Sequence, residues 1–242
     1  TAENGRIESK PIFDDEFVDN LKNHEDVLRS LRMKENLYII GTVNMDETTH
    51  PFSRKVLDRA NSLEFNDVEL SQINSVQDPP DEIELSNDVL KAEYVRLDPE
   101  LYNQRQDFFD EQISALEDIN EILRQGDFQV GYRVRDELCL YLHYADREDI
   151  LTVSDAFDFQ LKQKILPRLQ GSTDTISDIL QDLYEFTTSP DYNYGNAWSD
   201  NEDITNELES FDEENYDYPR SARKILRMQR RYLDQTFTSF WV

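Results

Sequence analysis

The apolar residues of this chain follow two different periods, and the change of period predicts how it is organised. Residues 36–43 form an almost unbroken apolar run, which is typical of a strand buried on both faces. Residues 52–60 have helical spacing, and residues 62–65 predict a second short strand. Strand, helix and strand in this order predict a small α/β unit, the only one that the pattern indicates.

The rest of the chain is predicted to be mostly helical. A short strand within 7–13 and a helix over 14–31 precede the α/β unit. After the break at Pro79-Pro80, apolar residues recur at helical spacing in five segments. These segments begin near Asp107, Arg133, Ser154, Ser172 or Thr173, and Pro219.

The fold class expected from this pattern is mostly α (α+β), with three regions. We expect a partial α/β domain over 1–66, a linker over 67–100 and a helical domain over 101–242. Near residues 189–218 the composition is acidic and includes Gly, Asn and Ser, which predicts a mobile acidic loop.

The charge of the chain limits its partners. It has 52 acidic and 25 basic residues, a formal net charge of −27. Such a surface repels DNA phosphate, so we expect no extensive direct DNA binding, although a small basic patch could still contact phosphate. Residues 172–217 contain 14 acids and no Lys or Arg, whereas six basic residues lie between Arg220 and Arg231. We therefore expect this last, basic helix to pack beside acidic surface of its own chain.

Other features narrow the class of protein. Cys139 is the only cysteine, which rules out an internal disulfide and favours a cytoplasmic protein, and its position on an apolar helix face predicts a buried side chain. No apolar stretch is long enough for a membrane span. The chain does not begin with Met, so we expect it to be processed or cut from a longer one. Three scattered histidines predict no metal site.

The clearest chemical signal follows the first predicted strand. Asn44 stands at the carboxyl end of that strand, which is where open α/β sheets bind ligands. A polar loop comes next, and the helix after it ends in Leu57-Asp58-Arg59. The alternative interpretation is structural: Asn44 caps a turn, and Arg59 pairs with Asp58 or another surface acid.

This segment resembles the sensor-1 and arginine-finger region of AAA+ NTPases of the McrB type, in the MoxR/McrB branch. The family pattern is an apolar strand, Thr-x-Asn, a variable loop, Pro-x-x-x-x-x-Leu-Asp-Arg and a short strand. Here it runs through Thr42-Val43-Asn44 and from Pro51 to Arg59, with matching order and spacing. The fold that this implies is a partial AAA+ α/β core followed by a helical lid.

The resemblance assigns roles to the matching residues. Asn44 would be sensor 1, bound to the attacking water or the γ-phosphate. Arg59 would be the arginine finger, which reaches the nucleotide of a neighbouring subunit and stabilises the charge of the transferring phosphoryl group. Arg54 is a second basic candidate on the same helix. Asp46 or Glu47 would take the acidic role of the loop.

Two weaker similarities lie in the helical region. Residues 126–140 resemble the start of the lid helix that carries sensor 2, with Arg133 as the first candidate and Arg135 as the second. The alternative is a solvated helix face on which Arg135 pairs with Asp136 or Glu137. The C-terminus resembles the tail of McrB-like proteins. The run Val43-Asn44-Met45-Asp46 departs from the loop of GTP-preferring members, so GTP and ATP both remain open.

Two motifs of such an NTPase are absent from the sequence. No Gly-x-x-x-x-Gly-Lys-Ser/Thr occurs, and no apolar strand ends in Asp-Glu, so the parts that hold phosphates and Mg²⁺ are missing. We therefore expect this chain alone to be inactive and to bind no nucleotide, and whether it is an enzyme stays open.

The implied parent is a GTP- or ATP-hydrolysing motor subunit of a modification-dependent restriction system. It would form a homo-oligomeric ring, work with an McrC-like nuclease and act on modified DNA only indirectly. The alternatives are a non-enzymatic helical interaction protein that docks on other subunits, and an acidic DNA mimic.

Overall fold

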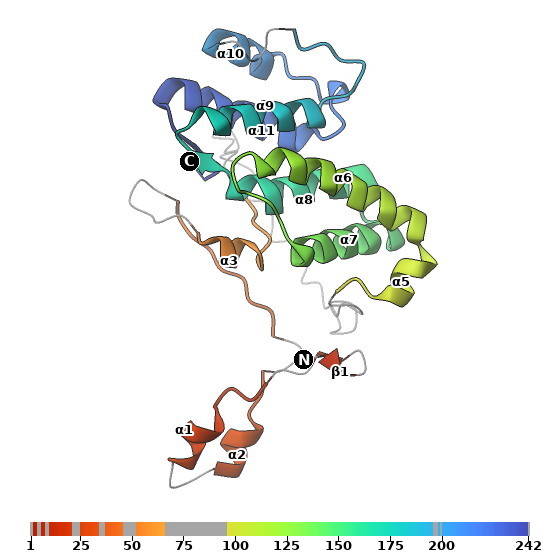
Figure 1. Cartoon of the computed structure of the whole chain (residues 1–242), viewed down its shortest axis with the longest axis vertical. Helices are drawn as coiled ribbons and strands as arrows, with labels where there is room; N and C mark the ends of the chain where they lie inside the picture. The colour runs from red at the N-terminus through yellow and green to blue at the C-terminus, as the bar shows by residue number, and fades with distance from the viewer. Residues whose placement is uncertain are drawn as a thin grey trace, which may run out of the picture. The chain divides into compact units, whose positions relative to one another are not determined.

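The structure is a computed structural model, and it describes residues 2–3, 6–7, 10–20, 25–33, 37–45, 52–65, 96–195, 198 and 200–241 (Figure 1). The chain divides into two units, Thr1–Val43 with Asp67–Val95 and Asn44–Asn66 with Arg96–Val242. By this division the described residues 52–65 group with the helical part of the chain.

The first unit contains little regular structure among its described residues. β1 (Ala2–Glu3) pairs antiparallel with β2 (Arg6–Ile7), and α1 (Asp15–Asp19) and α2 (Glu25–Ser30) follow. The single helix predicted over 14–31 is thus wrong, because α1 ends at its C-cap Asn20. Arg29 of α2 binds the carboxylates of Asp15, at 2.6 Å, and Asp19 on α1.

The strand predicted over 36–43 is wrong for the described part of that run. Residues 37–43 form no strand, and Ile39 and Ile40 are 81% and 91% exposed. Residues 62–65 also form no strand. The physical reason is that a strand is stabilised by hydrogen bonds to a neighbouring strand, and none of the described elements provides one beside either segment.

The second unit is helical. Its helices and turns are α3 (Arg54–Leu57), α5 (Pro99–Gln104), α6 (Gln106–Arg124), α7 (Tyr132–Arg147), α8 (Val153–Gln160), the π-helical turn η1 (Leu161–Ile165), the 3₁₀ turn η2 (Leu166–Arg168), α9 (Asp174–Thr187), α10 (Asn201–Glu209), η3 (Glu213–Asn215) and α11 (Pro219–Gln235). Two short strands, β3 (Gln170–Gly171) and β4 (Thr238–Ser239), pair antiparallel. The predicted helices near 107, 133, 173 and 219 are confirmed within a few residues.

The core of this unit lies between α6, α7, α8, α9 and α11. Figure 1 shows α9 and α11 side by side, and each of the five helices buries one apolar face. Phe109, Leu138, Phe157, Leu183 and Leu226 are buried representatives of these faces. The helical period of the sequence is therefore sufficient to explain which side of each helix points inward.

The end of α8 departs from the predicted helix. Thr152 caps it instead of Ser154, because the Thr152 hydroxyl accepts the backbone N–H of Asp155 at 3.1 Å. The chain then widens into η1 and tightens into η2, which contains Pro167. Proline lacks the N–H that a regular α-helix needs, so the helical hydrogen-bond ladder changes before it ends. The buried side chain of Arg168 lies at the end of η2.

The acidic segment near 189–218 was predicted to be a loop, and this is wrong for 201–209, which form α10. The segment is held by aromatic residues. Glu207 of α10 accepts the hydroxyls of Tyr184, at 3.0 Å, Tyr192, at 2.9 Å, and Tyr216 on one carboxylate oxygen. Ile204 is also fully buried, so this segment has a small core of its own in spite of its charge.

The buried tyrosines are expected to resist ionisation. Burial raises the pKa of Tyr184 and Tyr216, and it raises that of Tyr194 and Tyr218 to about 12. A phenol whose folded pKa exceeds its unfolded value of 10.0 contributes stability fully below pH 10, and this contribution is lost as the pH rises through the folded pKa. Tyrosinate absorbance should therefore rise in two steps, the second near or above pH 12 and accompanied by loss of helical circular dichroism.

The control for this titration is the urea-unfolded chain, in which all 12 tyrosines should ionise together near pH 10. A single transition near pH 10 in the folded chain, with its helical signal unchanged, would contradict the burial of these phenols.

Candidate functional site

Leu57, the last residue of α3, and the two residues after it, Asp58 and Arg59, lie in three different environments. Leu57 is buried. The Asp58 carboxylate binds the guanidinium of Arg168, which is 4% exposed. Arg59 is exposed, and its Nη1 donates to the backbone carbonyl of Lys55 at 2.5 Å. The partner of Asp58 is therefore Arg168, and the predicted alternative of an Arg59–Asp58 pair is not what the structure has.

Arg54, at the start of the same helix, belongs to a small pocket. Its Nη1 donates to the Asp127 carbonyl at 2.7 Å, and its guanidinium lies 5.1 Å from the centre of the Phe128 ring. The pocket has a volume of about 160 Å³ and is lined by Phe52, Arg54, Leu57, Phe128, Pro167, Arg168, Gln170 and Trp241. Arg54 thus ties α3 to the connection between α6 and α7.

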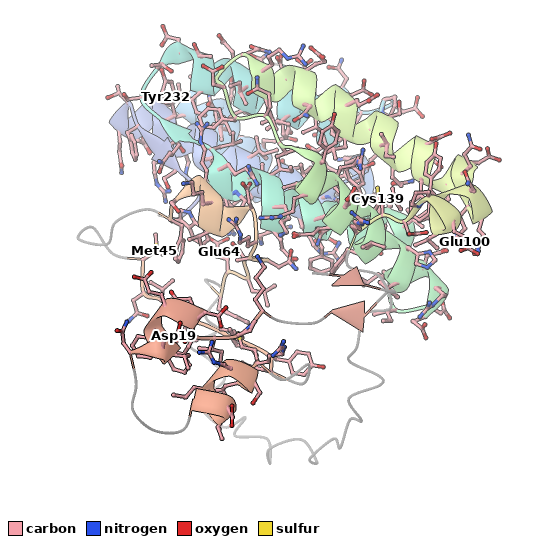
Figure 2. The ribbon with its side chains drawn as sticks, turned by 60° about the horizontal axis from the view of Figure 1, so that its bottom comes forward. Asp19, Met45, Glu64, Glu100, Cys139 and Tyr232 are labelled. Carbon is pink, nitrogen blue, oxygen red and sulfur yellow. The ribbon has the colours of Figure 1, made fainter. Side chains whose placement is uncertain are left out.

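The second end of this segment is held by Glu64, whose side chain is mostly buried against the helical unit (Figure 2). Its carboxylate accepts the ammonium of Lys224 at 2.5 Å, and Lys162 lies 4.0 Å away. Lys224 is 7% exposed and lies 4.3 Å from the centre of the Phe240 ring. Burial lowers the pKa of Lys224, and the hydrogen bond to Glu64 opposes this shift.

The basic helix α11 meets acidic side chains of its own chain, as predicted. Besides the Lys224–Glu64 pair, Arg220 binds Asp155 at 2.7 Å. This contact and the N-cap hydroxyl of Thr152 lower the pKa of Asp155, with the hydroxyl as the larger cause. The change from the acidic stretch 172–217 to the basic helix α11 therefore reflects packing within the helical unit.

The remaining predicted site residues lie elsewhere in the chain. Asn44 is exposed and outside any helix or strand, and Asp46 and Glu47 lie outside the described residues. Arg133 is exposed in the first turn of α7. Arg135 binds Asp136 at 2.6 Å and lies 5.0 Å from the centre of the Tyr132 ring, which is the structural alternative considered for it.

The structure therefore groups these residues by helix. Arg54 is the first residue of α3 and Arg59 lies two residues after its last one, Leu57, whereas Arg133 and Arg135 both lie on α7. The partners that hold the segment 52–65, Arg168 and Lys224, were missed by sequence reasoning. They lie 110 and 160 residues after Asp58 and Glu64, so no local spacing connects them. Both cations stand near other basic residues in the sequence and look there like ordinary surface cations.

Other sources of chemistry are limited in the described part of the chain. Cys139 (labelled in Figure 2) is buried as predicted. Burial raises the pKa of its thiol to about 12, which keeps the thiol neutral at physiological pH. Among the described residues, no group of three or more His, Cys, Asp or Glu is arranged to hold a metal ion. No described helix is both long and apolar enough to cross a membrane.

Comparison with known proteins gives one finding. The model of the family described as Domain of unknown function (DUF8727) matches residues 81–237. No curated protein and no solved structure matches significantly. The matched region contains α5 to α11 and begins after the segment that carries Asn44 and Arg59. Since the match covers more than half of the chain, this protein belongs to the DUF8727 family.

Proposed function

We propose that this chain is the C-terminal part of a nucleotide-hydrolysing motor subunit of the McrB type. In this proposal Arg59 acts as an arginine finger on the nucleotide of a neighbouring subunit, and Asn44 acts as the sensor at the end of the preceding apolar run. The observation that carries the proposal is the placement of Arg59. Arg59 is exposed just after the end of α3. The two residues before it, Leu57 and Asp58, are both held by the helical unit.

This arrangement suits a group that acts in trans. A finger must project from its own subunit and still be held in position, because its benefit comes from placing a guanidinium where charge develops in the transition state. Leu57 and Asp58 provide the anchor, and Arg59 provides an exposed charge, with its Nη1 bonded to the Lys55 carbonyl at 2.5 Å. Arg54 is tied to Asp127 and Phe128, so we assign it to anchoring rather than to catalysis.

The exposed apolar run supports the expectation of a missing partner part. It is unfavourable for a contiguous apolar, β-rich segment such as 37–43 to face water. Its pattern suits a strand that pairs with the edge of a sheet covered on both faces. We propose that a nucleotide-binding part supplies this sheet together with the phosphate loop and the Mg²⁺ ligands. That part would lie in a preceding segment of the same polypeptide or in a partner chain.

The nucleotide is GTP or ATP with Mg²⁺, bound by the complete protein and not by this chain alone. The ring of subunits and an McrC-like nuclease would then act on modified DNA in the cytoplasm. Contact between this chain and the DNA would be indirect, because the chain carries a formal charge of −27. Arg133, exposed at the start of α7, remains the candidate for sensor 2, whereas Arg135 has Asp136 as its partner.

The test is Arg59→Ala in the protein that includes the nucleotide-binding part. Hydrolysis is expected to fall at least ~100-fold, because the finger stabilises the transition state, while nucleotide affinity stays within about twofold. The matched control is Lys55→Ala, which removes a cation from the same exposed face of α3 but leaves the backbone carbonyl that accepts Arg59.

Turnover and binding of a fluorescent nucleotide should be measured for both variants. Equal turnover in Arg59→Ala and the parent protein would refute the finger assignment. Micromolar nucleotide binding to the 242-residue chain alone, seen by calorimetry, would refute the expectation that it lacks a complete nucleotide site.

A further inference from the structure

Two ion pairs hold the segment 52–65, and they lie on both sides of Arg59. Asp58 comes one residue before Arg59, and Glu64 comes five residues after it. Their cations are among the least exposed charged groups of the described chain, with Arg168 at 4% and Lys224 at 7%. The two cations come from different elements, η2 and α11. The segment 52–65 is therefore fixed to the rest of the helical unit at Asp58 and at Glu64 by ion pairs whose cations are buried.

From this arrangement we propose that Arg168 and Lys224 are positioning residues for Arg59, so that the helical unit controls where the finger points. The inference rests on the proposed function, since it treats Arg59 as the group that acts on nucleotide. It adds a regulatory connection: any rearrangement that moves η2 or α11 moves α3 and its exposed arginine together.

The first cation is held by a second bond besides its contact with Asp58. Arg168 Nε donates to the Lys164 carbonyl at 2.8 Å, which fixes the plane of the guanidinium within the π-helical region. Lys164 is itself buried and bound by Glu137 of α7. Asp58 thus meets a guanidinium held by its own turn, and a preorganised donor loses little freedom when it binds.

The second cation is also held independently of its partner. The Lys224 ammonium lies over the Phe240 ring next to β4, and Lys162 of η1 lies within 4.0 Å of the same Glu64 carboxylate. Glu64 therefore meets positive charge from two elements, which makes it the acidic centre of a small basic cluster. At the first attachment point the ion pair lies next to the π-helical turn η1. At the second, the cation of the ion pair lies over the Phe240 ring.

The two ion pairs couple the docking of the segment 52–65 to the stability of the helical unit. Removing one partner of a buried ion pair is costly, because it leaves the other charge desolvated without compensation. If 52–65 undocked, Arg168 and Lys224 would both be left in this condition unless they moved. The packing of Phe52 against Trp241, with ring centres 5.3 Å apart, would be lost in the same step.

The test begins with hydrogen exchange on the isolated chain, which needs no nucleotide. Amides of α3 and its end, from Val56 to Ala60, are hydrogen-bonded within the helix, and those of α9 serve as an internal standard. Asp58→Asn is expected to speed exchange in α3 by ~10-fold or more and to leave α9 unchanged. The matched control is Asp178→Asn, an exposed change of the same kind on α9, which should leave α3 unchanged.

A double-mutant cycle separates anchoring from general damage. Arg168→Met removes the buried cation, so Asp58→Asn should then have little further effect on α3 exchange. Arg168→Lys, which keeps the charge, should retain part of the protection. If Arg168→Met fails to fold, Asp58→Asn and Glu64→Gln can be compared instead. They remove the acidic partner of each ion pair and leave Arg168 and Lys224 in place.

In the protein with its nucleotide-binding part, Asp58→Asn should lower kcat by ~10-fold or more with KM nearly unchanged, because Arg59 is present but misplaced. Fast α3 exchange together with this kcat loss supports the proposal. Unchanged α3 exchange in both Asp58→Asn and Glu64→Gln overturns it, even if Arg59→Ala abolishes hydrolysis. If Arg59→Ala leaves hydrolysis intact while Asp58→Asn still releases α3, the proposed function fails and the anchoring stands.

Discussion

Replacing Asp158 by alanine is expected to lower the free energy of unfolding by about 3–5 kcal/mol. Asp158 lies on α8 and is fully buried, yet it caps a different helix. Its two carboxylate oxygens accept the backbone N–H groups of Arg220, at 2.8 Å, and Ser221, at 2.9 Å. These are among the first N–H groups of α11, which have no partner within that helix.

Two further interactions make this carboxylate hard to replace. The Arg220 guanidinium lies 3.5 Å from it, and the positive end of the α11 dipole faces the negative charge. The Ser221 hydroxyl donates to the Asp158 backbone carbonyl at 3.1 Å, a bond that alanine would keep. Alanine would leave two buried N–H groups without an acceptor. Asparagine would restore only one acceptor, so Asp158→Asn should be intermediate.

Urea denaturation followed by circular dichroism measures this effect. The control is Asp178→Ala, which removes an exposed carboxylate from the middle of α9 and should change stability by no more than about 0.5 kcal/mol. A loss below about 1 kcal/mol for Asp158→Ala would mean that water or another acceptor satisfies α11 when the carboxylate is removed.

The second large effect is expected for Glu207→Gln, which should cost about 2–3 kcal/mol. One oxygen of Glu207 accepts the hydroxyls of Tyr184, Tyr192 and Tyr216, and the Tyr184 and Tyr216 hydroxyls are also 2.9 Å from each other. Glutamine keeps the shape of the side chain but removes the charge that strengthens all three bonds. The loss should therefore exceed that of one ordinary hydrogen bond.

Glu209→Gln is the matched control, because it makes the same change two residues away on the same helix at an exposed position. Its effect on the urea midpoint should be small. Equal midpoints for Glu207→Gln and Glu209→Gln would show that the tyrosine cluster gains its stability from ring packing alone, as in the stacking of Phe211 on Tyr216.

The helices of the second unit were predictable because their information is local. Apolar residues of α6, α7, α9 and α11 recur at helical spacing, and Pro219 marks the first turn of the last of them. The strands were not predictable in the same way. The run 37–43 has a strong strand pattern, but a strand also needs a neighbour, and the pattern of one segment says nothing about whether that neighbour is present.

The candidate site shows the same division. The helical spacing over 52–60 correctly predicted a helix at α3, although the helix is shorter than expected. The partners of its acids could not be predicted, because Arg168 and Lys224 look like ordinary surface cations in the sequence and become buried only through the packing of η2 and α11. The helix α10 was missed because the loop was predicted from the acidic composition, with 14 acids in residues 172–217. The aromatic residues that hold the helix were not considered.

The distance along the chain between the paired charges also has a consequence for synthesis. Asp58 and Glu64 leave the ribosome 110 and 160 residues before Arg168 and Lys224. Closing loops of this length has an entropic cost that only a preformed docking surface can offset. The segment 52–65 should therefore be the last part of the helical unit to assemble. Until α11 is complete, the nascent chain exposes Leu57 and Phe52, and this interval is when a chaperone would bind it.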